Sequence, residues 1–530
     1  MSSSSQPRGI RWWPLGFVAL ATAIAVGVVR TDPARSYQQR NLATLTIAAC
    51  TLGAVLLWWL FASRTSIRRK LTGLGAVLLL AGVGAGLFRI RGVSGDLVPI
   101  LEPRWNQWLA SSSVAAAKPT GAAPLIPAES AVGISKLVQD AASEYPQFLG
   151  ARRDGVLPAP ARAWGTNWSV RPPEVVWRHP IGPAWSGFAV AGGMAWTQEQ
   201  SGPQEKVTCY ELSTGRLIWE HADEARYATT IAGEGPRATP TVSGSRVITL
   251  GATGWLNCLD RATGKKIWSH NLVSEVPAGT PGWGFSGSPM VHQGMVIVIA
   301  GGNDGRSVVA YDLESGALRW SGGTHGASYS SPVLATLAGV PQILAFNSSH
   351  LTSHDPATGA VLWDHPFGNE QPHVAVPILI GTNRVLISAG YGMGSELVEV
   401  ASPSAGKLVP SALWHSRKLK AKFSTPFVRD GFAYGLDDGM FACVELKDGA
   451  QRWKEGRFGH GQGLLVGNHY LLMAEIGELV LLNPSPEGLG MLGKFRVFSD
   501  KTWNPIAVVG NLVLVRNDQE AALVRIPESN

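Results

Sequence analysis

The hexapeptide TGRLIW at Thr214–Trp219 decides the fold, because close variants of it return along the chain. The copies are TGKKIW (263–268), SGALRW (315–320), TGAVLW (358–363) and DGAQRW (448–453). In every copy a Gly stands four residues before a Trp. With Trp177, Trp414 and Phe495 added, the aromatic position recurs at steps of about 40 to 50 residues, a period typical of β-propellers.

Each repeat also carries three strand-like apolar runs ahead of this motif, for example Thr239–Gly244 and Arg246–Ala252. The third run ends in a small residue followed by a carboxylate: Cys209/Glu211, Cys258/Asp260, Ala310/Asp312, Ser353/Asp355 and Cys443/Glu445. We therefore expect four-stranded blades whose Gly sits in a turn and whose Trp fills the wedge between neighbouring blades. The acids should stabilise turns, and the cysteines should be small, buried free thiols.

The repeats predict an all-β fold with eight blades. Their inner strands begin near Trp185, Ala238, Gly287, Ser330, Ala375, Ser424, Leu464 and Asn504. The last unit, Val508–Ile526, lacks a Trp strand, whereas Val175–Pro180 has that strand without a blade before it. We expect this segment to complete blade eight, which closes the ring and leaves no sheet edge open.

The first hundred residues have a different character. Three uncharged apolar runs, 12–29, 42–62 and 71–88, are long enough to cross a bilayer, so residues 1–104 read as an anchor with three transmembrane helices. The loop Ser63–Lys70 carries four basic residues and no acid, which favours a cytoplasmic position. This orientation places the anchor in a bacterial inner (cytoplasmic) membrane, surrounded by its lipid, and the propeller in the periplasm.

Charge follows the same division. Residues 1–104 contain 12 Lys+Arg and 3 Asp+Glu, a net of +9, so the overall +7 leaves −2 for residues 105–530. The basic balance therefore belongs to the anchor, and we expect no nucleic-acid partner. Residues 105–144, rich in Ala, Pro and Ser, are typical of a linker, and the propeller occupies 145–530. The sequence has no CxxC pairing, and we predict no metal site.

The repeat resembles the pyrroloquinoline quinone (PQQ) type found in propellers of the quinoprotein alcohol dehydrogenase-like family. The resemblance rests on the Ser/Thr–Pro pairs of the inner strands (239–240, 288–289, 331–332 and 425–426), the acid after the third strand and the TGxxxW close. The segment Gln147–Gly155 is also similar to the lead-in of such proteins. The resemblance covers about residues 145–530 and implies the fold more strongly than an activity.

Two branches of this family suggest two different functions. The propeller of the outer-membrane barrel-assembly machinery is a non-catalytic periplasmic binding protein, and the membrane quinoprotein dehydrogenases join several spans to a periplasmic PQQ domain. The blades here are short, and no calcium ligand or catalytic Asp of the dehydrogenases can be carried over. We therefore expect a non-catalytic scaffold that binds an envelope protein, without a cofactor. The alternatives are a dehydrogenase that uses PQQ with Ca²⁺ and passes electrons to the quinone pool, or a ligand sensor.

Function should depend on the residues just ahead of the inner strands, which we expect to converge on one mouth of the central channel. The candidates are Trp185, Arg237, Trp283, Tyr329, His373, Lys422, His460 and Trp503. Aromatic rings with cations could bind a protein, or could stack on a planar ring and hold its carboxylates. The third possibility is that the aromatic side chains simply fill the channel. We predict no catalytic residue among them.

Overall fold

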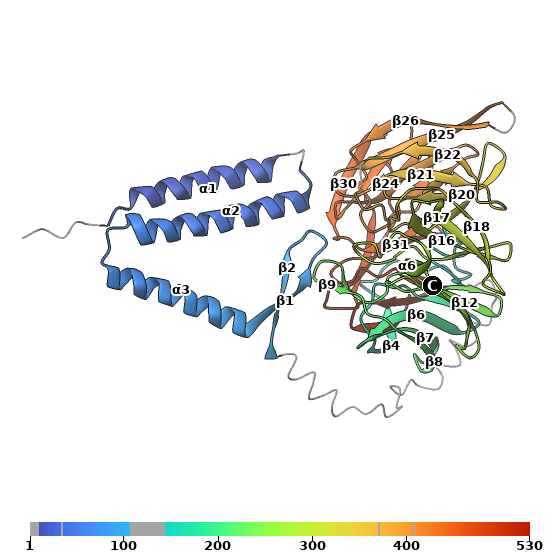
Figure 1. The fold of residues 1–530 in the computed structure, drawn as a ribbon, viewed down its shortest axis with the longest axis horizontal. Helices are drawn as coiled ribbons and strands as arrows, with labels where there is room; N and C mark the ends of the chain where they lie inside the picture. The colour runs from blue at the N-terminus through green and yellow to red at the C-terminus, as the bar shows by residue number, and fades with distance from the viewer. Residues whose placement is uncertain (1–9, 33–34, 106–143, 369–370, 405–406, 530) are drawn as a thin grey trace, which may run out of the picture. The chain divides into compact units, whose positions relative to one another are not determined.

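The structure is a computed structural model that describes residues 10–32, 35–105, 144–368, 371–404 and 407–529. The chain divides into two compact units, 1–121 and 122–530. The long helices belong to the first unit and the blades to the second (Figure 1). The fold predicted from the repeats, an eight-bladed propeller preceded by three long apolar helices, is confirmed.

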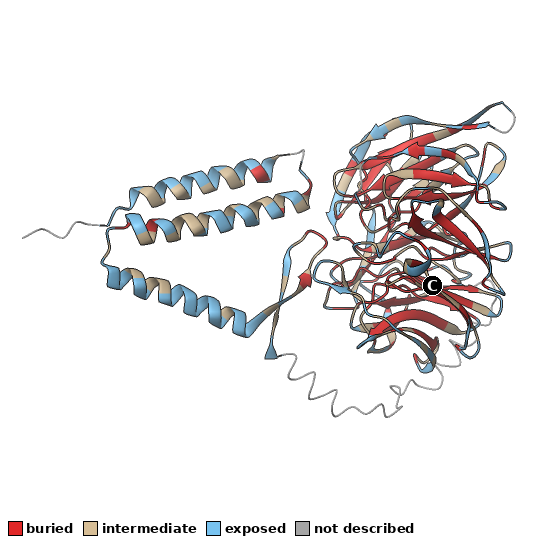
Figure 2. Cartoon of the chain, in the orientation of Figure 1, coloured by how far each residue is buried: buried red, intermediate tan, exposed pale blue. Residues whose placement is uncertain are grey.

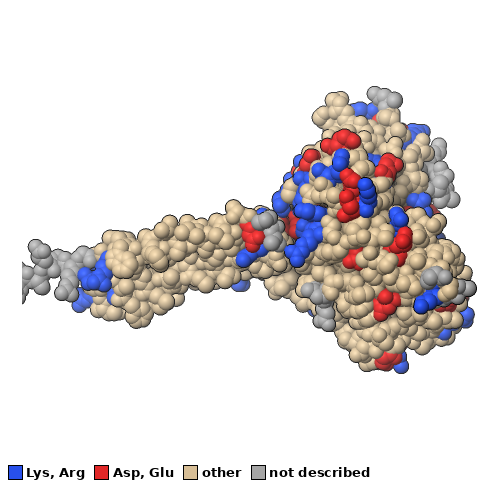
Figure 3. All heavy atoms as spheres, turned by 90° about the horizontal axis from the view of Figure 1, so that it is seen from above, with Lys and Arg blue, Asp and Glu red and all other residues tan. Residues whose placement is uncertain are grey.

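The first unit contains α1 (Trp13–Thr31), α2 (Tyr37–Leu57), which continues as the π-helical turn η1 (Trp58–Ala62), and α3 (Ile67–Leu87). All three helices are long and apolar enough to cross a membrane. Most of their apolar side chains are exposed, as surfaces that face lipid would be (Figure 2). The Lys and Arg residues gather at the ends of this unit, and its sides are largely free of charge (Figure 3).

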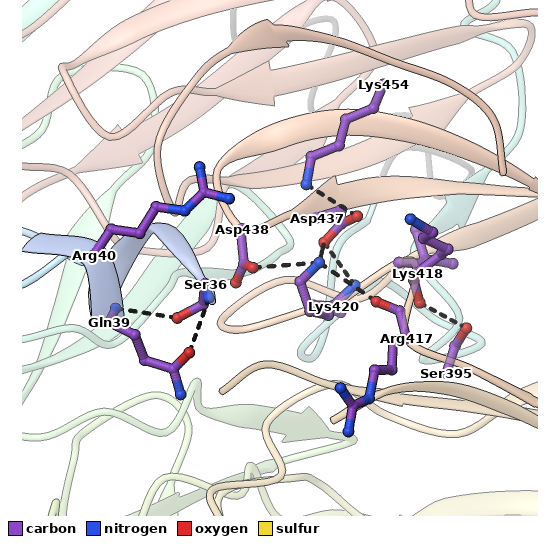
Figure 4. Close-up of polar contacts among 12 residues, drawn as sticks. Ser36, Gln39, Arg40, Ser395, Arg417, Lys418, Lys420, Asp437, Asp438 and Lys454 are labelled. Atoms are coloured by element: carbon purple, nitrogen blue, oxygen red, sulfur yellow. Dashed lines mark hydrogen bonds and ion pairs between the residues drawn. The ribbon is translucent and has the colours of Figure 1, made fainter. Parts of the chain in front are cut away.

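The second and third helices begin earlier than the apolar runs predicted. Helix α2 starts at Tyr37 because Ser36 and Gln39 form a capping box, with bonds of 2.9 and 3.2 Å (Figure 4). Helix α3 starts at Ile67, so the basic residues 68–70 form its first turn.

The sequence did not predict the hairpin of β1 (Phe88–Val93) and β2 (Pro99–Pro103). The expected linker falls almost entirely outside the described residues.

The propeller consists of eight sheets whose blade strands pair antiparallel and follow the chain from the inside outward, except that blade eight takes its outer strand from earlier in the chain and blade seven gains a fifth, parallel strand. Blades one to four are β5–β8 (Ala189–Ala191, Met194–Ser201, Gln204–Glu211, Leu217–Glu224), β11–β14 (Thr241–Ser243, Arg246–Leu250, Trp255–Asp260, Lys266–Asn271), β15–β18 (Met290–His292, Met295–Gly302, Arg306–Asp312, Leu318–Gly322) and β19–β22 (Val333–Leu337, Val340–Phe346, His350–His354, Val361–Pro366). The connection between blades one and two contains the short strands β9 (Ala228–Thr229) and β10 (Gly233–Glu234). The short helix α6 (Leu272–Glu275) follows β14.

The remaining blades complete the circle. They are β23–β26 (Ile378–Ile380, Arg384–Ala389, Gly394–Ser404, Lys407–Ser416), β27–β30 (Phe427–Arg429, Phe432–Asp437, Met440–Glu445, Gln451–Arg457), β31–β34 (Gln462–Val466, His469–Met473, Glu478–Leu482, Met491–Arg496), and β35–β37 (Ala507–Val509, Leu512–Arg516, Glu520–Arg525) with β4 (Glu174–Pro180). Strand β4 pairs with β37, where Trp177 lies opposite Leu523. The last blade therefore takes its outer strand from the beginning of the domain, as the sequence predicted.

The recurring Gly and Trp are partners across successive blades. Gly359, in the turn of blade four, has a φ of +74°, and a Cβ on it would lie 2.4 Å from Cε3 of Trp320 in blade three. The Trp320 indole also donates to the carbonyl of Pro356 in the same turn, at 3.0 Å. Equivalent pairs are Gly215/Trp177, Gly264/Trp219, Gly316/Trp268 and Gly449/Trp414. The motif thus encodes a contact between blades, in which only glycine leaves room for the indole.

The Ser/Thr–Pro pairs hold the inner strands together. The backbone N–H of Thr239 donates to Ser288 Oγ at 3.0 Å, and that of Ser288 donates to Ser331 Oγ at 2.8 Å. Blade one joins blade two in the same way, through Gly187 and Thr239 at 3.2 Å. Each hydroxyl therefore satisfies a backbone donor of the preceding blade near the channel, where an unpaired N–H would be costly.

The acids and cysteines occupy the structural positions expected from the repeat. Asp260 accepts from the N–H and the hydroxyl of Thr263, at 2.9 and 2.7 Å, and the hydroxyl lowers the pKa of Asp260. Cys258 lies directly opposite Trp268 on the neighbouring strand, where a larger side chain would compete with the indole for space. The cysteines are free thiols, and the three in the propeller are buried.

Candidate functional site at the channel mouth

The candidate site lies where the connections between blades meet the axis. Neighbouring inner strands contact each other around this axis, for example β5 with β11 and β35. Each inner strand runs away from the connection that precedes it, and the second strand returns. The turns between second and third strands therefore share one face of the propeller with the connections between blades. Side chains from both kinds of loop meet at this mouth.

One arc of the mouth is a chain of three aromatic rings. The rings of Trp185 and Trp503 lie 4.9 Å apart, and Phe423 packs edge-on against Trp503 at 5.1 Å. Lys501 places its Nζ 4.0 Å from the Trp503 ring and 4.8 Å from the Trp185 ring. Blades one, six and eight are joined here by contacts that combine ring packing with cation–π attraction.

A second arc comes from blades three, four and five. Trp283 stacks on Tyr329 at 5.0 Å and lies 5.8 Å from Tyr391. Lys422 connects this arc to the first, because its Nζ lies 4.8 Å from the Tyr391 ring and 5.5 Å from the Phe423 ring. Tyr391 has a φ of +58°, an unfavourable backbone conformation for an aromatic residue.

Arg237 and Tyr227 close the circle. The guanidinium lies 4.3 Å from the Tyr227 ring, and the Tyr227 hydroxyl donates to the carbonyl of Gly282 at 2.5 Å. Arg237 also donates to the carbonyl of Ala232, which accepts from the Trp185 indole at 2.7 Å. We call this circle the mouth ring; its members are Trp185, Tyr227, Arg237, Trp283, Tyr329, Tyr391, Lys422, Phe423, Lys501 and Trp503.

The three cations of the mouth ring are held in low-polarity surroundings. Arg237, Lys422 and Lys501 are each less than a tenth exposed. Burial lowers the pKa of Arg237 to about 10, which still leaves it charged at neutral pH. Two carboxylates lie beside the ring: Glu475 accepts from the Trp503 indole at 3.0 Å, and the charge of Glu205 raises the pKa of Arg237.

Six of the eight residues predicted for the mouth belong to the ring. His460 packs edge-on against Phe423 at 5.5 Å, and its backbone N–H donates to Glu475 Oε2 at 2.9 Å. His373 lies apart, because its imidazole is fully buried and stacks on Phe346 at 4.1 Å. Burial lowers the pKa of His373 to about 4, so this histidine is neutral.

Several residues of the site were not predicted. Phe423 follows the predicted Lys422, and Lys501 stands two residues before the predicted Trp503, so the same loops carry them. Tyr391 comes from the turn between the second and third strands of blade five, a kind of loop that the sequence interpretation left out. Glu475, which accepts from the Trp503 indole at 3.0 Å, comes from the same kind of turn in blade seven and was missed for the same reason.

A salt-bridge network fixes the loop that carries Lys422 and Phe423. Lys420 places its Nζ 2.5 Å from Asp437 Oδ1 and 3.3 Å from Asp438 Oδ2, and Lys454 reaches Asp437 Oδ2 at 3.1 Å (Figure 4). Asp437 is fully buried. Burial would raise the pKa of Asp437, but the two lysines outweigh it and hold that pKa below its usual range.

The lead-in segment fills the channel from the opposite face. Strand β3 (Val156–Leu157) pairs in parallel with β31, and Tyr145 bridges Val190 of blade one. Between them, the buried Arg153 donates to the carbonyls of Ser288 and Pro289 at 2.8 and 2.9 Å. Burial lowers the pKa of Arg153 to about 9. The lead-in thus ties several inner strands together, a role that its sequence did not reveal.

Comparison with known proteins agrees with this architecture. A family profile described as outer membrane protein assembly factor BamB matches residues 170–274 and 203–455, which together span more than half of the chain. No curated protein sequence matches the chain.

Similar solved structures include a BamB protein and alcohol dehydrogenases. The structure of BamB from Moraxella catarrhalis has 16% identity and a TM-score of 0.46, with 67% of this chain and 99% of that one covered. The quinohemoprotein alcohol dehydrogenase from Comamonas testosteroni has 13% identity and a TM-score of 0.52, covering 76% and 84%. A second such dehydrogenase, ADHIIG from Pseudomonas putida HK5, has 12% identity and a TM-score of 0.52, covering 76% and 83%. At these identities the likeness concerns the fold alone.

Proposed function

The chain belongs to the family of the outer membrane protein assembly factor BamB, and on this premise we propose that it is a membrane-anchored, non-catalytic scaffold that binds a protein partner in the cell envelope. The observation that carries the proposal is the mouth ring. It gathers Trp, Tyr, Phe and Arg side chains from many blades into one connected surface. These residue types dominate the energetic centres of protein interfaces.

The mouth ring also indicates what the partner offers. Half-buried rings such as Trp283, Tyr329 and Tyr391 can pack against apolar or aromatic side chains without a large loss of side-chain entropy. The cations beside them lie against the rings, and Glu205 and Glu475 already supply negative charge next to the mouth ring. We therefore infer a partner segment rich in apolar and aromatic residues.

The competing function, a dehydrogenase that uses PQQ with Ca²⁺, fits the mouth ring less well. A planar cofactor sandwiched between two rings needs a gap of about 7 Å, twice the van der Waals contact distance. The ring pairs Trp185–Trp503, Trp283–Tyr329 and Trp283–Tyr391 lie only 4.9 to 5.8 Å apart. Ca²⁺ requires six to eight oxygen ligands, usually several carboxylates, whereas the mouth ring has no carboxylate of its own and the adjacent Glu475 accepts from Trp503 and His460. This geometry favours protein binding, and we propose no cofactor.

We further propose that the anchor lies in the bacterial inner membrane with the turn between α2 and α3 in the cytoplasm. Trp12 and Trp58 lie 5.9 Å apart, and Trp59 follows at this same end of the helix pair. Tryptophan collects at membrane interfaces, and Arg68, Arg69 and Lys70 at this end favour the cytoplasmic side. The propeller then follows the third span into the periplasm. A reporter that is active only in the cytoplasm, fused after Asn530, should remain inactive; activity would overturn this orientation.

Affinity purification from membranes tests the binding function. The full-length protein should recover an envelope protein, and Trp283→Ala or Tyr329→Ala should reduce that recovery at least about tenfold, as expected for interface hot spots. Leu318→Ala is the matched control, because Leu318 is an exposed apolar side chain on the outer strand β18. Equal recovery with all three variants would contradict the proposed site. Dye reduction by the purified protein supplied with PQQ and Ca²⁺ would instead support the dehydrogenase.

A further inference from the structure

Three side chains, two from blade four and one from the connection that leads into it, form a compact group on the same face as the mouth ring. His325 lies in the connection after β18, His350 begins β21, and Asp364 lies on β22. One ligand atom from each residue lies within 4.8 Å of the other two. It is the only such group of three or more His, Cys, Asp or Glu side chains among the residues that the structure describes.

The geometry within the group is well defined. His325 Nε2 lies 2.8 Å from Asp364 Oδ2, and the two imidazole rings stack at 3.8 Å with an angle of 13° between their planes. Asp364 is exposed and both histidines are partly exposed, so solutes can reach all three. Two neighbouring strands of blade four supply His350 and Asp364, and the connection between blades three and four supplies His325.

Further hydrogen bonds orient the two histidines. His350 Nδ1 lies 2.8 Å from Ser349 Oγ, which leaves Nε2 as the nitrogen available to a ligand. The backbone carbonyl of His325 accepts from Ser307 Oγ at 2.6 Å, which fixes the loop that carries this side chain. Outer contacts of this kind are typical of metal-binding histidines.

We propose that His325, His350 and Asp364 bind a divalent transition-metal ion, with Zn²⁺ as the best match to two imidazoles and one carboxylate. Around a tetrahedral Zn²⁺ the ligand atoms lie about 3.3 Å apart, given metal–ligand distances of about 2.0 Å. His325 Nε2 and Asp364 Oδ2 lie 2.8 Å apart, and all three ligand atoms lie within 4.8 Å of one another, so small side-chain movements reach that value. One imidazole must also rotate out of the stack, because the lone pairs of two nearly parallel rings do not converge on one ion. Water completes the coordination on the exposed side. The sequence predicted no metal site, so this proposal differs from that expectation. It does not depend on the proposed partner binding.

An ordinary salt bridge between His325 and Asp364 explains the group less completely. His325 can donate Nε2–H to Asp364 in its neutral or its protonated form, but either contact leaves the His350 imidazole out of the bridge. A metal ion uses all three side chains at once, because both neutral imidazoles and the carboxylate donate lone pairs to it.

Equilibrium dialysis of the full-length protein in detergent, first treated with a chelator, tests the site with Zn²⁺ alone. We use a Cys50→Ser background, because Cys50 is the one exposed cysteine. The protein should bind one Zn²⁺ at this site, and His350→Ala or Asp364→Asn should weaken binding at least about 100-fold. Ser349→Ala should weaken it about tenfold, as expected for an outer contact. Co²⁺ in place of Zn²⁺ should give the visible absorption bands of a low-symmetry site, and His350→Ala should abolish them.

His270→Ala is the matched control, because His270 also contacts a carboxylate, Glu275, at 2.8 Å but has no third ligand in the described structure. This variant should keep the Zn²⁺ affinity of the parent protein. Unfolding midpoints measured without metal separate a lost ligand from a lost fold. The proposal is overturned if the parent protein binds no Zn²⁺ at micromolar concentrations, or if His350→Ala and His270→Ala weaken binding equally while both remain folded.

Discussion

The contact between Gly359 and Trp320 makes a quantitative prediction about how the blades hold together. In Gly359→Ala the new Cβ would lie 2.4 Å from Trp320 Cε3, and the residue would keep a φ of +74°. The left-handed backbone costs roughly 1–2 kcal/mol for alanine. Displacing a packed indole costs about 1–3 kcal/mol more. We therefore expect the free energy of unfolding to fall by about 2–5 kcal/mol.

Gly339→Ala separates these two contributions. Gly339 has a φ of +79°, and a Cβ on it would meet nothing within 4 Å. This control should lose only the roughly 1–2 kcal/mol of the backbone. Denaturant unfolding of the full-length protein in detergent, followed by tryptophan fluorescence, measures both variants.

A double-mutant cycle tests the physical contact directly. In the Gly359→Ala background, Trp320→Leu should cost less than in the parent protein by about 1–3 kcal/mol, because the smaller side chain relieves the clash. Equal losses for Gly359→Ala and Gly339→Ala, together with no coupling in the cycle, would refute the explanation of the repeat motif.

Three further predictions follow from individual contacts. Trp177→Ala removes the indole that closes blade eight and its 2.8 Å bond to the Leu212 carbonyl, and should lower the unfolding free energy by about 3–5 kcal/mol; an unchanged unfolding midpoint would contradict the closure. Lys420→Met leaves the buried Asp437 with one lysine and should lower the free energy of unfolding by about 3–5 kcal/mol at pH 7. This loss should shrink below pH 4 as Asp437 is protonated, and a loss independent of pH would be inconsistent with the ion pair. His373 has a pKa of about 4 in the folded protein, below the ordinary 6.5, so its contribution to the free energy of unfolding is complete above pH 6.5 and is lost as the pH falls toward 4. Unfolding curves measured across that range should therefore show a weaker pH dependence in His373→Gln than in the parent protein. Identical pH profiles would show that another group titrates.

The repeat sequence predicted the fold well because each element of the motif has one structural role. The turn Gly, the strand Trp and the inner hydroxyls all act between neighbouring blades, so their periodic recurrence reported the architecture directly. The closing strand around Trp177 was predictable for the same reason, since it was the one motif without a blade. The hairpin β1–β2 was not predicted because it is short and interrupts no repeat.

The candidate site was less predictable, because it breaks the symmetry of the repeat. The sequence predicted Trp185, Trp283 and Trp503 at the mouth because they stand just ahead of inner strands. It could not show that the His373 side chain turns into the core. Tyr391 comes from a different class of loop, and its part in the ring depends on a distance that only the fold sets. The metal-binding group was hidden for the same reason, because His325, His350 and Asp364 are separated in sequence and meet only when the strands pair.

Photo-crosslinking at the mouth tests the central claim most directly. A photoreactive amino acid in place of Tyr329 should capture an envelope protein in living cells, whereas the same group in place of Val361, an exposed residue on the outer strand β22, should capture far less. A strong crosslink from position 329 that Trp283→Ala removes would agree with a protein-binding mouth. Equal capture from both positions, or capture from Val361 alone, would contradict it.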